Sequence, residues 1–322
     1  MPERLPGTTP GRLRVAVIGV GHLGRHHARL LAGMPGVELI GVVDTAPGRA
    51  AEIAAAHQTA AHTDWRDLRG RVDAVTIAVP TESHADVALG CIDAGAAVLV
   101  EKPLASSVAD ATRIVEAAAR RGVVCAVGHS ERFNPAVAAA LPHIADPRFV
   151  EVHRLGAFPD RSLDVDVIFD LMIHDLDLLL ATVGSDVVGI EAVGVHVLTG
   201  KTDIANARLR FASGCIANLT ASRISRDRVR KARFFQRRSY VSIDFAAREV
   251  EMYRLVAGDG RPAIDGGRLE VTNEEPLRRE LEDFVHAIRD GRAPGVTGEA
   301  GREALVLATR VAEAMSAGAD RP

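Results

Sequence analysis

The segment Arg14-Val-Ala-Val-Ile-Gly-Val-Gly-His-Leu-Gly-Arg25 runs a short apolar strand directly into three spaced glycines. In the pattern Gly19-x-Gly21-x-x-Gly24, the first glycine allows a tight turn and the second allows close approach of a pyrophosphate. The third lets the next helix pack against the strand. The free N–H groups and the dipole of that helix attract phosphate. The segment predicts a dinucleotide-binding site, and the alternative is a doubly wound domain whose site is empty.

A second strand, Val37-Glu-Leu-Ile-Gly-Val-Val-Asp44, ends in an acid 20 residues after Gly24. An acid at this place hydrogen-bonds the ribose hydroxyls of the adenosine and repels a 2′-phosphate. We therefore expect Asp44 to select NAD as the cofactor. Arg49 lies close enough in the sequence to leave NADP open as an alternative.

Three further apolar strands follow within the first 130 residues, and each ends in polar residues. The strands are 72–80, 96–100 and 123–127, and the groups that end or follow them are Thr81-Glu-Ser-His84, Glu101-Lys102-Pro103 and Gly128-His129. Near-continuous apolar strands are typical of a parallel sheet that is buried on both faces. Because such sheets bind ligands outside the carboxyl ends of their strands, we expect a Rossmann domain over residues 1–130 with its site at these ends.

Lysine is rare in this chain, because only three of its 39 basic residues are lysines. A buried lysine can lose its proton, whereas an arginine in practice cannot. Lys102 follows a buried strand and precedes Pro103, which would hold it in an extended conformation. Lys201 lies in a turn sequence and Lys231 in a run of arginines. We therefore predict a functional role for Lys102, against the alternative that all three are survivors of codon bias.

The second half contains a long apolar segment, residues 167–180, which predicts a helix that ends at Gly184. At 3.6 residues per turn, Asp170, His174 and Asp177 fall on one face of this helix. An acid one turn from a histidine can orient the ring and raise its basicity, as general acid–base chemistry requires. The alternatives are a structural histidine, solvated or capping acids, and a metal site, although the spacing matches no zinc pattern.

The remaining sequence predicts a second domain over residues 131–322. Six strand candidates between residues 189 and 255, without intervening helices, predict a large, mostly antiparallel sheet in an α+β domain. Helices are expected at 275–289 and 299–317. We expect one face of the sheet to be open and covered by another subunit, in a dimer or tetramer. The arginine-rich segment 223–238 is interpreted as a solvated or subunit-facing surface, or as a contact for an anionic diphosphate.

Composition excludes several classes of protein. The 322 residues carry a formal charge of −3, balanced in both halves, which argues against a nucleic-acid partner. The three cysteines, Cys91, Cys125 and Cys215, form neither a disulfide framework nor a zinc pattern. No apolar stretch approaches the ~18 residues of a membrane span. We therefore expect a soluble, cytoplasmic protein.

Together these features resemble the Gfo/Idh/MocA family of oxidoreductases. The matching motifs are Gly19–Gly24, Val79-Pro-Thr-x-x-x-His84, Glu101-Lys102-Pro103 and Asp170-x-x-x-His174-x-x-Asp177. The resemblance implies NAD(P)-dependent oxidation or reduction of a sugar or polyol. It implies that Lys102 and His174 flank the reacting carbon with help from Asp170, and that Asp177 is structural. No metal is implied.

Within this family, Gly128-His-Ser-Glu-Arg-Phe-Asn-Pro135 and Phe169–Asp177 resemble the branch that acts on nucleotide-activated amino sugars. The implied substrate is UDP-N-acetylglucosamine, oxidised at C3 in lipid A biosynthesis. Met172 stands where the family commonly has glycine. The alternatives are an inositol or free-sugar dehydrogenase and a non-catalytic NAD-binding sensor.

The expected site residues follow from these motifs. The expected cofactor contacts are Gly19, Gly21, His22, Leu23, Gly24, Asp44, Pro80, Thr81, His84, Glu101 and Lys102. The expected substrate contacts are Arg132, Asn134, Arg161 and His174.

Overall fold

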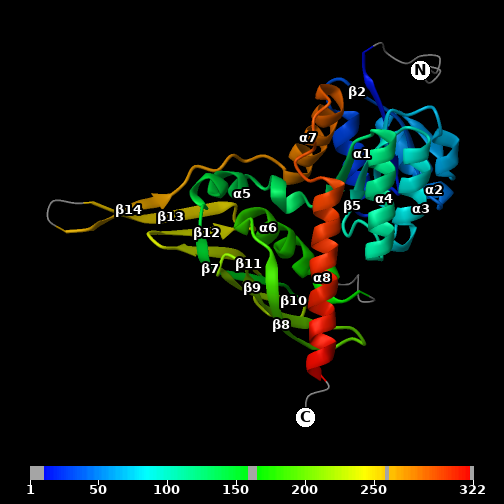
Figure 1. The fold of residues 1–322 in the computed structure, drawn as a ribbon. Coiled ribbons are helices and arrows are strands. Elements are labelled where there is room, and N and C mark those ends of the chain that lie inside the picture. Colours follow the sequence, from blue (N-terminus) through cyan, green and yellow to red (C-terminus); the bar gives the residue numbers. More distant parts are fainter. Residues whose placement is uncertain (1–10, 159–164, 258–260, 320–322) are drawn as a thin grey trace. The chain divides into compact units, whose positions relative to one another are not determined.

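The computed structural model describes residues 11–158, 165–257 and 261–319, and the chain divides into two compact units (Figure 1). The first unit combines the chain up to Ser130 with Leu277–Arg302, and the second contains the rest. The expected second domain, residues 131–322, therefore differs from the structure in its C-terminal part. The reason is that helix α7 (Pro276–Asp290) buries Leu281 and Phe284 in the hydrophobic core of the first unit.

The first unit is built on a six-stranded parallel sheet with the order β3-β2-β1-β4-β5-β6. Its strands are β1 (Leu13–Ile18), β2 (Val37–Val43), β3 (Ala60–His62), β4 (Ala74–Ile77), β5 (Ala97–Glu101) and β6 (Cys125–Gly128). This is the strand order of the dinucleotide-binding Rossmann fold, so the predicted fold of the N-terminal half is confirmed. The order reverses between β1 and β4, which is where such sheets bind their ligands.

Helices connect these strands, and their ends follow from local sequence. They are α1 (Gly24–Ala32), α2 (Pro47–His57), α3 (His84–Asp93) and α4 (Val108–Arg121). Ser107 caps α4 by accepting the N–H of Asp110, and Gly122 ends it in the left-handed conformation at φ 65°. The central strand β1 is buried, with Val15 and Val17 fully inaccessible, which explains its unbroken apolar sequence.

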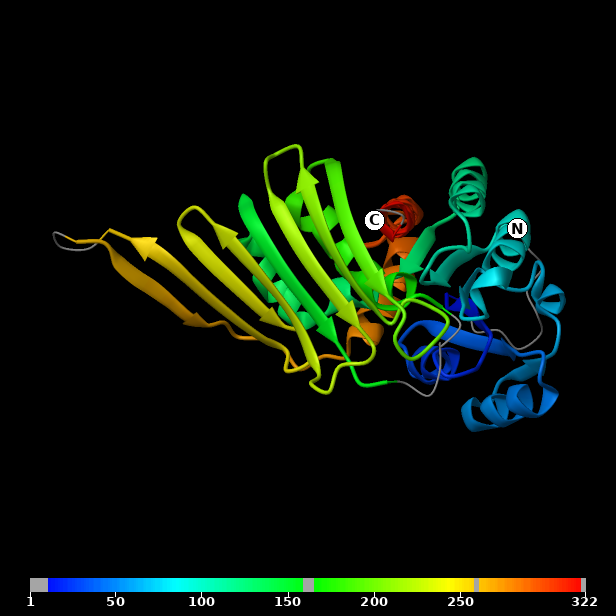
Figure 2. The same cartoon turned by 90° about the horizontal axis from the view of Figure 1, so that it is seen from below.

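The second unit is built on an eight-stranded sheet with the order β14-β13-β12-β11-β7-β10-β9-β8 (Figure 2). Its strands are β7 (Pro147–Leu155), β8 (Val187–Val195), β9 (Ile204–Phe211), β10 (Ile216–Ser222), β11 (Val229–Gln236), β12 (Ser239–Asp244), β13 (Glu249–Val256) and β14 (Ala263–Arg268). All pairs are antiparallel except β10 with β7. The predicted mostly antiparallel sheet is confirmed. Strand β14 was not predicted, because its sequence Ala-Ile-Asp-Gly-Gly-Arg is exposed and lacks apolar alternation.

Helices of the second unit cover one face of this sheet. They are α5 (Pro135–Ala140), α6 (Ile173–Val183) and the later part of α8 (Gly298–Ala319). Alternate strand residues such as Ala207, Leu209 and Phe234 are buried against these helices. Their neighbours Arg208 and Arg210 are exposed on the opposite face, so the expected open face is present.

A buried ion pair anchors the start of β9. Asp203 Oδ2 accepts the N–H groups of residues 197–199, and Asp203 Oδ1 accepts the Nε–H of Arg223 at 2.9 Å. Burial alone would raise the pKa of Asp203, but these donors hold it below its usual range. Arg223 also donates to the carbonyl of Val165. Arg223, the first arginine of the segment 223–238, is therefore structural. It is not part of a solvated or subunit-facing surface.

Two kinds of structural feature are absent from the described residues. None of the helices in the ranges above is long and apolar enough to cross a membrane. No group of three or more histidine, cysteine, aspartate or glutamate side chains within those ranges is arranged to hold a metal ion.

Candidate active site

The glycine turn after β1 has the geometry that a bound pyrophosphate requires. Gly19 has φ +83°, and a Cβ atom on it would lie 2.6 Å from the carbonyl oxygen of Ala78. A Cβ on Gly24 would overlap the carbonyl of Gly19, which packs α1 tightly against the turn. A Cβ on Gly21, in contrast, would meet no atom of the chain within 4 Å. The turn is thus closed toward the sheet and open on its outer side, which fits a dinucleotide.

Asp44 lies at the end of β2 and its carboxylate is held by three donors. Its Oδ2 accepts the N–H of Val20 at 3.2 Å, and its Oδ1 accepts the N–H of Ala46 at 2.9 Å. The guanidinium of Arg49 is 3.3 Å from Oδ2. The acid is therefore fixed beside the glycine turn, and Arg49 partly offsets its charge. This arrangement supports the predicted ribose contact and explains how Arg49 could weaken discrimination against a 2′-phosphate.

The other expected cofactor contacts of the first unit lie at or near strand ends. His22 and Leu23 are exposed at the start of α1, while Pro80 and Thr81 begin the turn after β4. His84 differs from the others because its ring is buried. Its Nδ1 is 2.9 Å from the carbonyl oxygen of Pro103, and its Nε2 is 3.0 Å from that of Val79. His84 thus links the two strand ends, and burial lowers its pKa.

Lys102 directly follows β5 and is half-buried. The Lys102–Pro103 peptide bond is cis. Glu101 before it is buried, and its carboxylate accepts the Lys102 N–H at 3.2 Å. Glu101 also pairs with a fully buried histidine of α1, His27, which the sequence analysis did not single out. The only available signal was the place of His27 in the first turn of the helix that follows the glycines.

The predicted regular helix around His174 is wrong in its first part. Residues Ile168–Met172 form a π-helical turn, and the α-helix α6 begins only at Ile173. A π turn has more residues per turn than an α-helix, so the 3.6-residue spacing that predicts one shared face does not apply before Ile173. Both side chains are half-buried. Single π turns inside helices are frequent at functional sites, which strengthens the assignment of a site here.

The two acids that follow His174 are buried in ion pairs. Asp175 binds Arg154 through two bonds of 2.9 and 2.6 Å, and Glu131 lies 3.6 Å from the same guanidinium. Asp177 lies 3.4 Å from Arg132. The alternative that these acids are solvated is therefore wrong. They fix the helix that carries His174 to β7 and to the turn at Ser130–Phe133.

The expected substrate contacts are placed differently from one another. Arg132 forms the ion pair with Asp177 and remains partly accessible, with 22% of its side chain exposed. Asn134 is buried, and both ends of its side-chain amide are bonded within the protein. The amide oxygen accepts the N–H of Ala136 at the start of α5, and the amide nitrogen donates to the carbonyl of Phe245. Arg161 lies outside the described residues. The substrate contacts of these three residues stay predictions.

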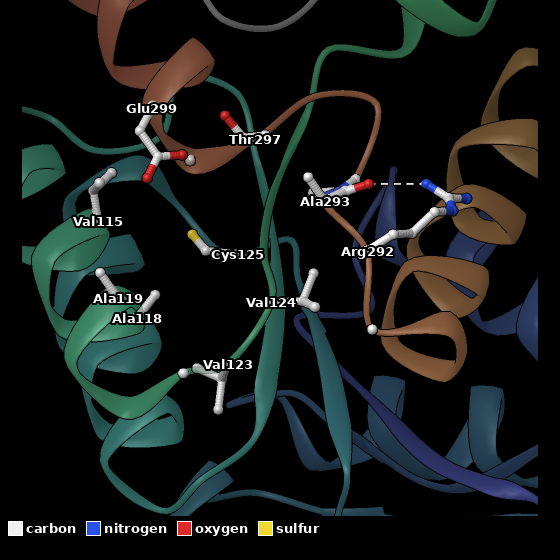
Figure 3. Close-up of a pocket in the computed structure, with 14 residues that line it drawn as sticks. Val115, Ala118, Ala119, Val123, Val124, Cys125, Arg292, Ala293, Thr297 and Glu299 are labelled. Atoms are coloured by element: carbon white, nitrogen blue, oxygen red, sulfur yellow. Dashed lines mark hydrogen bonds between the residues drawn. The ribbon is translucent and has the colours of Figure 1, made fainter.

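A separate pocket of about 300 Å³ lies in the first unit beside β6 (Figure 3). Val115, Ala118 and Ala119 of α4 line it together with Cys125 and the loop of residues 291–299. Burial raises the pKa of the Cys125 thiol to about 12, so the thiol stays protonated near neutral pH and is a poor nucleophile. The thiol in this pocket is therefore not a candidate nucleophile.

Comparisons with known proteins agree with this geometry. Residues 13–129 match a family model described as an oxidoreductase family with an NAD-binding Rossmann fold, and residues 143–238 match the GFO/IDH/MocA C-terminal domain. The chain is 40% identical over 308 residues to UDP-N-acetylglucosamine 3-dehydrogenase of Acidithiobacillus ferrooxidans, covering 95% of this chain and 98% of that protein. A solved structure of that enzyme matches with a TM-score of 0.89 and 39% identity, covering 95% of this chain and 98% of the solved chain.

The chain belongs to the Gfo/Idh/MocA oxidoreductase family. The predicted enzyme class and the predicted cofactor, NAD, are thereby confirmed, and the alternative of a non-catalytic sensor is not supported. The chain is also 30% identical over 237 residues to scyllo-inositol 2-dehydrogenase (NAD(+)) of Bacillus subtilis, and the match covers 66% of this chain and 68% of that protein. A solved structure of levoglucosan dehydrogenase in complex with NADH and levoglucosan shares the fold. It matches with a TM-score of 0.86 and 19% identity, covering 95% of this chain and 97% of the solved chain.

The buried Asp177 predicts a pH-dependent cost to stability. Burial raises its pKa from 3.8 to about 7, although Arg132 opposes the shift. Because the pKa is raised in the folded state, protonated Asp177 stabilises the fold relative to the unfolded chain. This stabilisation is fully present below pH 3.8 and is lost as the pH rises through about 7. The Asp177→Asn variant avoids this loss. Its free energy of unfolding, measured by urea titration, should rise relative to wild type by up to about 4 kcal/mol between pH 4 and pH 8.

Asp175→Asn is the matched control, because it leaves the buried guanidinium of Arg154 without its two-bond partner. This variant should be destabilised at every pH, by about 3–5 kcal/mol. A constant difference between Asp177→Asn and wild type across the pH range would contradict the assignment of a raised pKa to Asp177.

Proposed function

We propose that the protein is an NAD-dependent dehydrogenase that oxidises the C3 hydroxyl of UDP-N-acetylglucosamine. One observation carries the proposal: the 40% identity over 95% of the chain to an enzyme of that name, together with the motifs of both units. The phosphate turn at Gly19–Gly24, the strand-end Lys102 and the π turn before His174 are the parts that this chemistry needs.

The residues of the chain divide the work of the reaction. The turn at Gly19–Gly24 and the fixed carboxylate of Asp44 hold NAD, which supplies the hydride acceptor when bound. His174 takes the proton of the substrate hydroxyl, with Asp170 assisting its orientation. Lys102 donates a hydrogen bond to the same oxygen and stabilises the charge that develops there. The protein thus contributes position and electrostatics around one carbon atom.

A free polyol is the second candidate substrate, because inositol dehydrogenases are among the relatives. The nucleotide-sugar is favoured by the much greater identity and coverage of its relative. Arg132 supports it as well, since this cation sits beside the helix of His174 and keeps part of its surface accessible. Guanidinium groups suit the phosphates of a nucleoside diphosphate.

Turnover on a substrate panel tests this proposal. NADH formation at 340 nm should be seen with NAD⁺ and UDP-N-acetylglucosamine, and should be at least about 100-fold weaker in kcat/KM with myo-inositol, scyllo-inositol or free N-acetylglucosamine. UDP should inhibit competitively against the sugar. Turnover of an inositol without inhibition by UDP would replace the proposal by the polyol alternative.

We also propose that two copies of the chain pair through the open sheet face. A row of register partners crosses the sheet from edge to edge. It consists of Gly189, Arg210, Ile216, Phe149, Phe235, Tyr240, Tyr253 and Gly266. The rings of Phe149 and Phe235 are 5.6 Å apart, and those of Phe235 and Tyr240 are 5.1 Å apart. Tyr253 continues the row and is 40% exposed.

The opposite end of the row has complementary chemistry. A hollow of about 360 Å³ is lined by Gly189 and by the exposed arginines Arg208 and Arg210. In a two-fold pairing of these faces, the aromatic end of one copy meets the arginine end of the other. Guanidinium groups pack well on aromatic rings, so each face complements itself.

Analytical ultracentrifugation tests the pairing. The wild-type protein should sediment as a dimer or tetramer at micromolar concentration. A Phe235→Asp/Tyr253→Asp double variant should dissociate, because it places charge at the centre of the buried row. Glu116→Ala, on the exposed side of α4, is the control and should leave the assembly unchanged. A wild-type monomer at about 50 μM would contradict the proposal.

A further inference from the structure

We propose that His27 is a positioning residue for Lys102 and acts through the carboxylate of Glu101. The proposal rests on the catalytic role of Lys102 in the proposed function. It concerns a histidine in the first turn of α1 whose side chain is fully inaccessible. All groups involved belong to the first unit.

The contact between His27 and Glu101 defines which atom carries the proton. Nε2 of His27 lies 3.0 Å from Oε1 of Glu101. An ionised carboxylate only accepts hydrogen bonds, so Nε2 must carry the proton that is shared. Nδ1 of His27 is buried and has no hydrogen-bond partner among the described residues. The ring therefore contacts Glu101 through Nε2 alone, and Nδ1 makes no bond among the described residues that would compete with this contact.

The second oxygen of the Glu101 carboxylate contacts the backbone of Lys102. Oε2 of Glu101 accepts the backbone N–H of Lys102 at 3.2 Å. The carboxylate therefore bridges α1 and the first peptide group beyond β5. Its orientation fixes the backbone at the residue that we assign to catalysis.

A glycine on the next strand closes the remaining side of the carboxylate. Gly128 of β6 is the register partner of Glu101 in the sheet. A Cβ atom on Gly128 would lie 2.9 Å from Oε2 of Glu101, which is closer than real Cβ atoms approach an oxygen. His27 and Gly128 therefore both contact the carboxylate, and a side chain at residue 128 would displace it.

The contact links two functional parts of the first unit. Helix α1 begins at the phosphate turn, and β5 ends at Lys102. The His27–Glu101 pair joins them below the surface, so the turn that holds the pyrophosphate and the lysine move as one body. Loss of His27 would leave Oε1 of Glu101 without this contact, so the carboxylate could turn away from its present orientation. Such a turn would release the backbone N–H of Lys102 from Oε2.

The three lysines of the chain allow a direct test that does not depend on turnover. Protein labelled with ¹³C at lysine Cε gives three side-chain signals, and Lys102→Arg, Lys201→Arg and Lys231→Arg variants assign them. In His27→Ala and in Gly128→Ala, the Lys102 signal should shift or broaden while the other two stay in place. In His27→Gln, whose amide can still donate to Glu101, the wild-type signal should return.

Steady-state kinetics provide the second readout. The His27→Ala and Gly128→Ala variants should lose on the order of 10- to 100-fold in kcat, with KM for the sugar changed less than about threefold. His27→Gln should recover most of kcat. His286→Ala, an exposed histidine of α7, is the control and should match wild type in both readouts.

The outcomes separate this inference from the proposed function. A folded His27→Ala protein with an unchanged Lys102 signal would overturn the positioning role, and so would an unshifted signal in Gly128→Ala if His27→Ala fails to fold. Absence of turnover with every substrate would overturn the proposed function only. The NMR signal of Lys102 would still show whether His27 determines the position of Lys102.

Discussion

The turn after β1 leaves no room for a side chain at Gly19 or Gly24, and the rest of the first unit depends on this constraint. A side chain at Gly24 would push α1 away from the turn, because it would overlap the carbonyl of Gly19. Close packing of α1 places His27 over the end of β5, where it meets Glu101. The same close packing that exposes the turn to phosphate therefore holds the strand end that carries Lys102.

In the second unit, buried ion pairs hold the helix that carries His174. Arg154 and Asp175 share two short bonds in a fully buried environment, and Arg132 pairs with Asp177 one turn beyond His174. Breaking such a pair leaves an uncompensated charge, so the pairs make the position of α6 specific even where they add little net stability. Burial raises the pKa of Asp177, so the ionised carboxylate is expected to cost stability near neutral pH.

The sequence predicted the features that follow from local pattern and missed those that depend on tertiary contacts. Apolar runs that end in glycine or acid located five of the six strands of the Rossmann sheet, and β3 was missed because its three residues, Ala-Ala-His, form no apolar run. Alternation located most of the second sheet. The π turn at Ile168–Met172 escaped prediction because a 3.6-residue pattern fits the same apolar residues. Helix α7 was assigned to the wrong unit, since an amphipathic pattern shows that a face is buried but not against which core. His27 was overlooked because its partner, Glu101, is 74 residues away in the chain.

The proposed catalysis requires Lys102 for the hydride transfer between the sugar and NAD⁺. Rapid mixing of NAD⁺-loaded Lys102→Arg protein with UDP-N-acetylglucosamine tests it most directly, because a single turnover reports the chemical step alone. Arginine keeps the positive charge but not the shape or the titratable proton of lysine. We expect no NADH in that turnover, although NAD⁺ should still bind to the variant. NADH formed at the wild-type rate would contradict it.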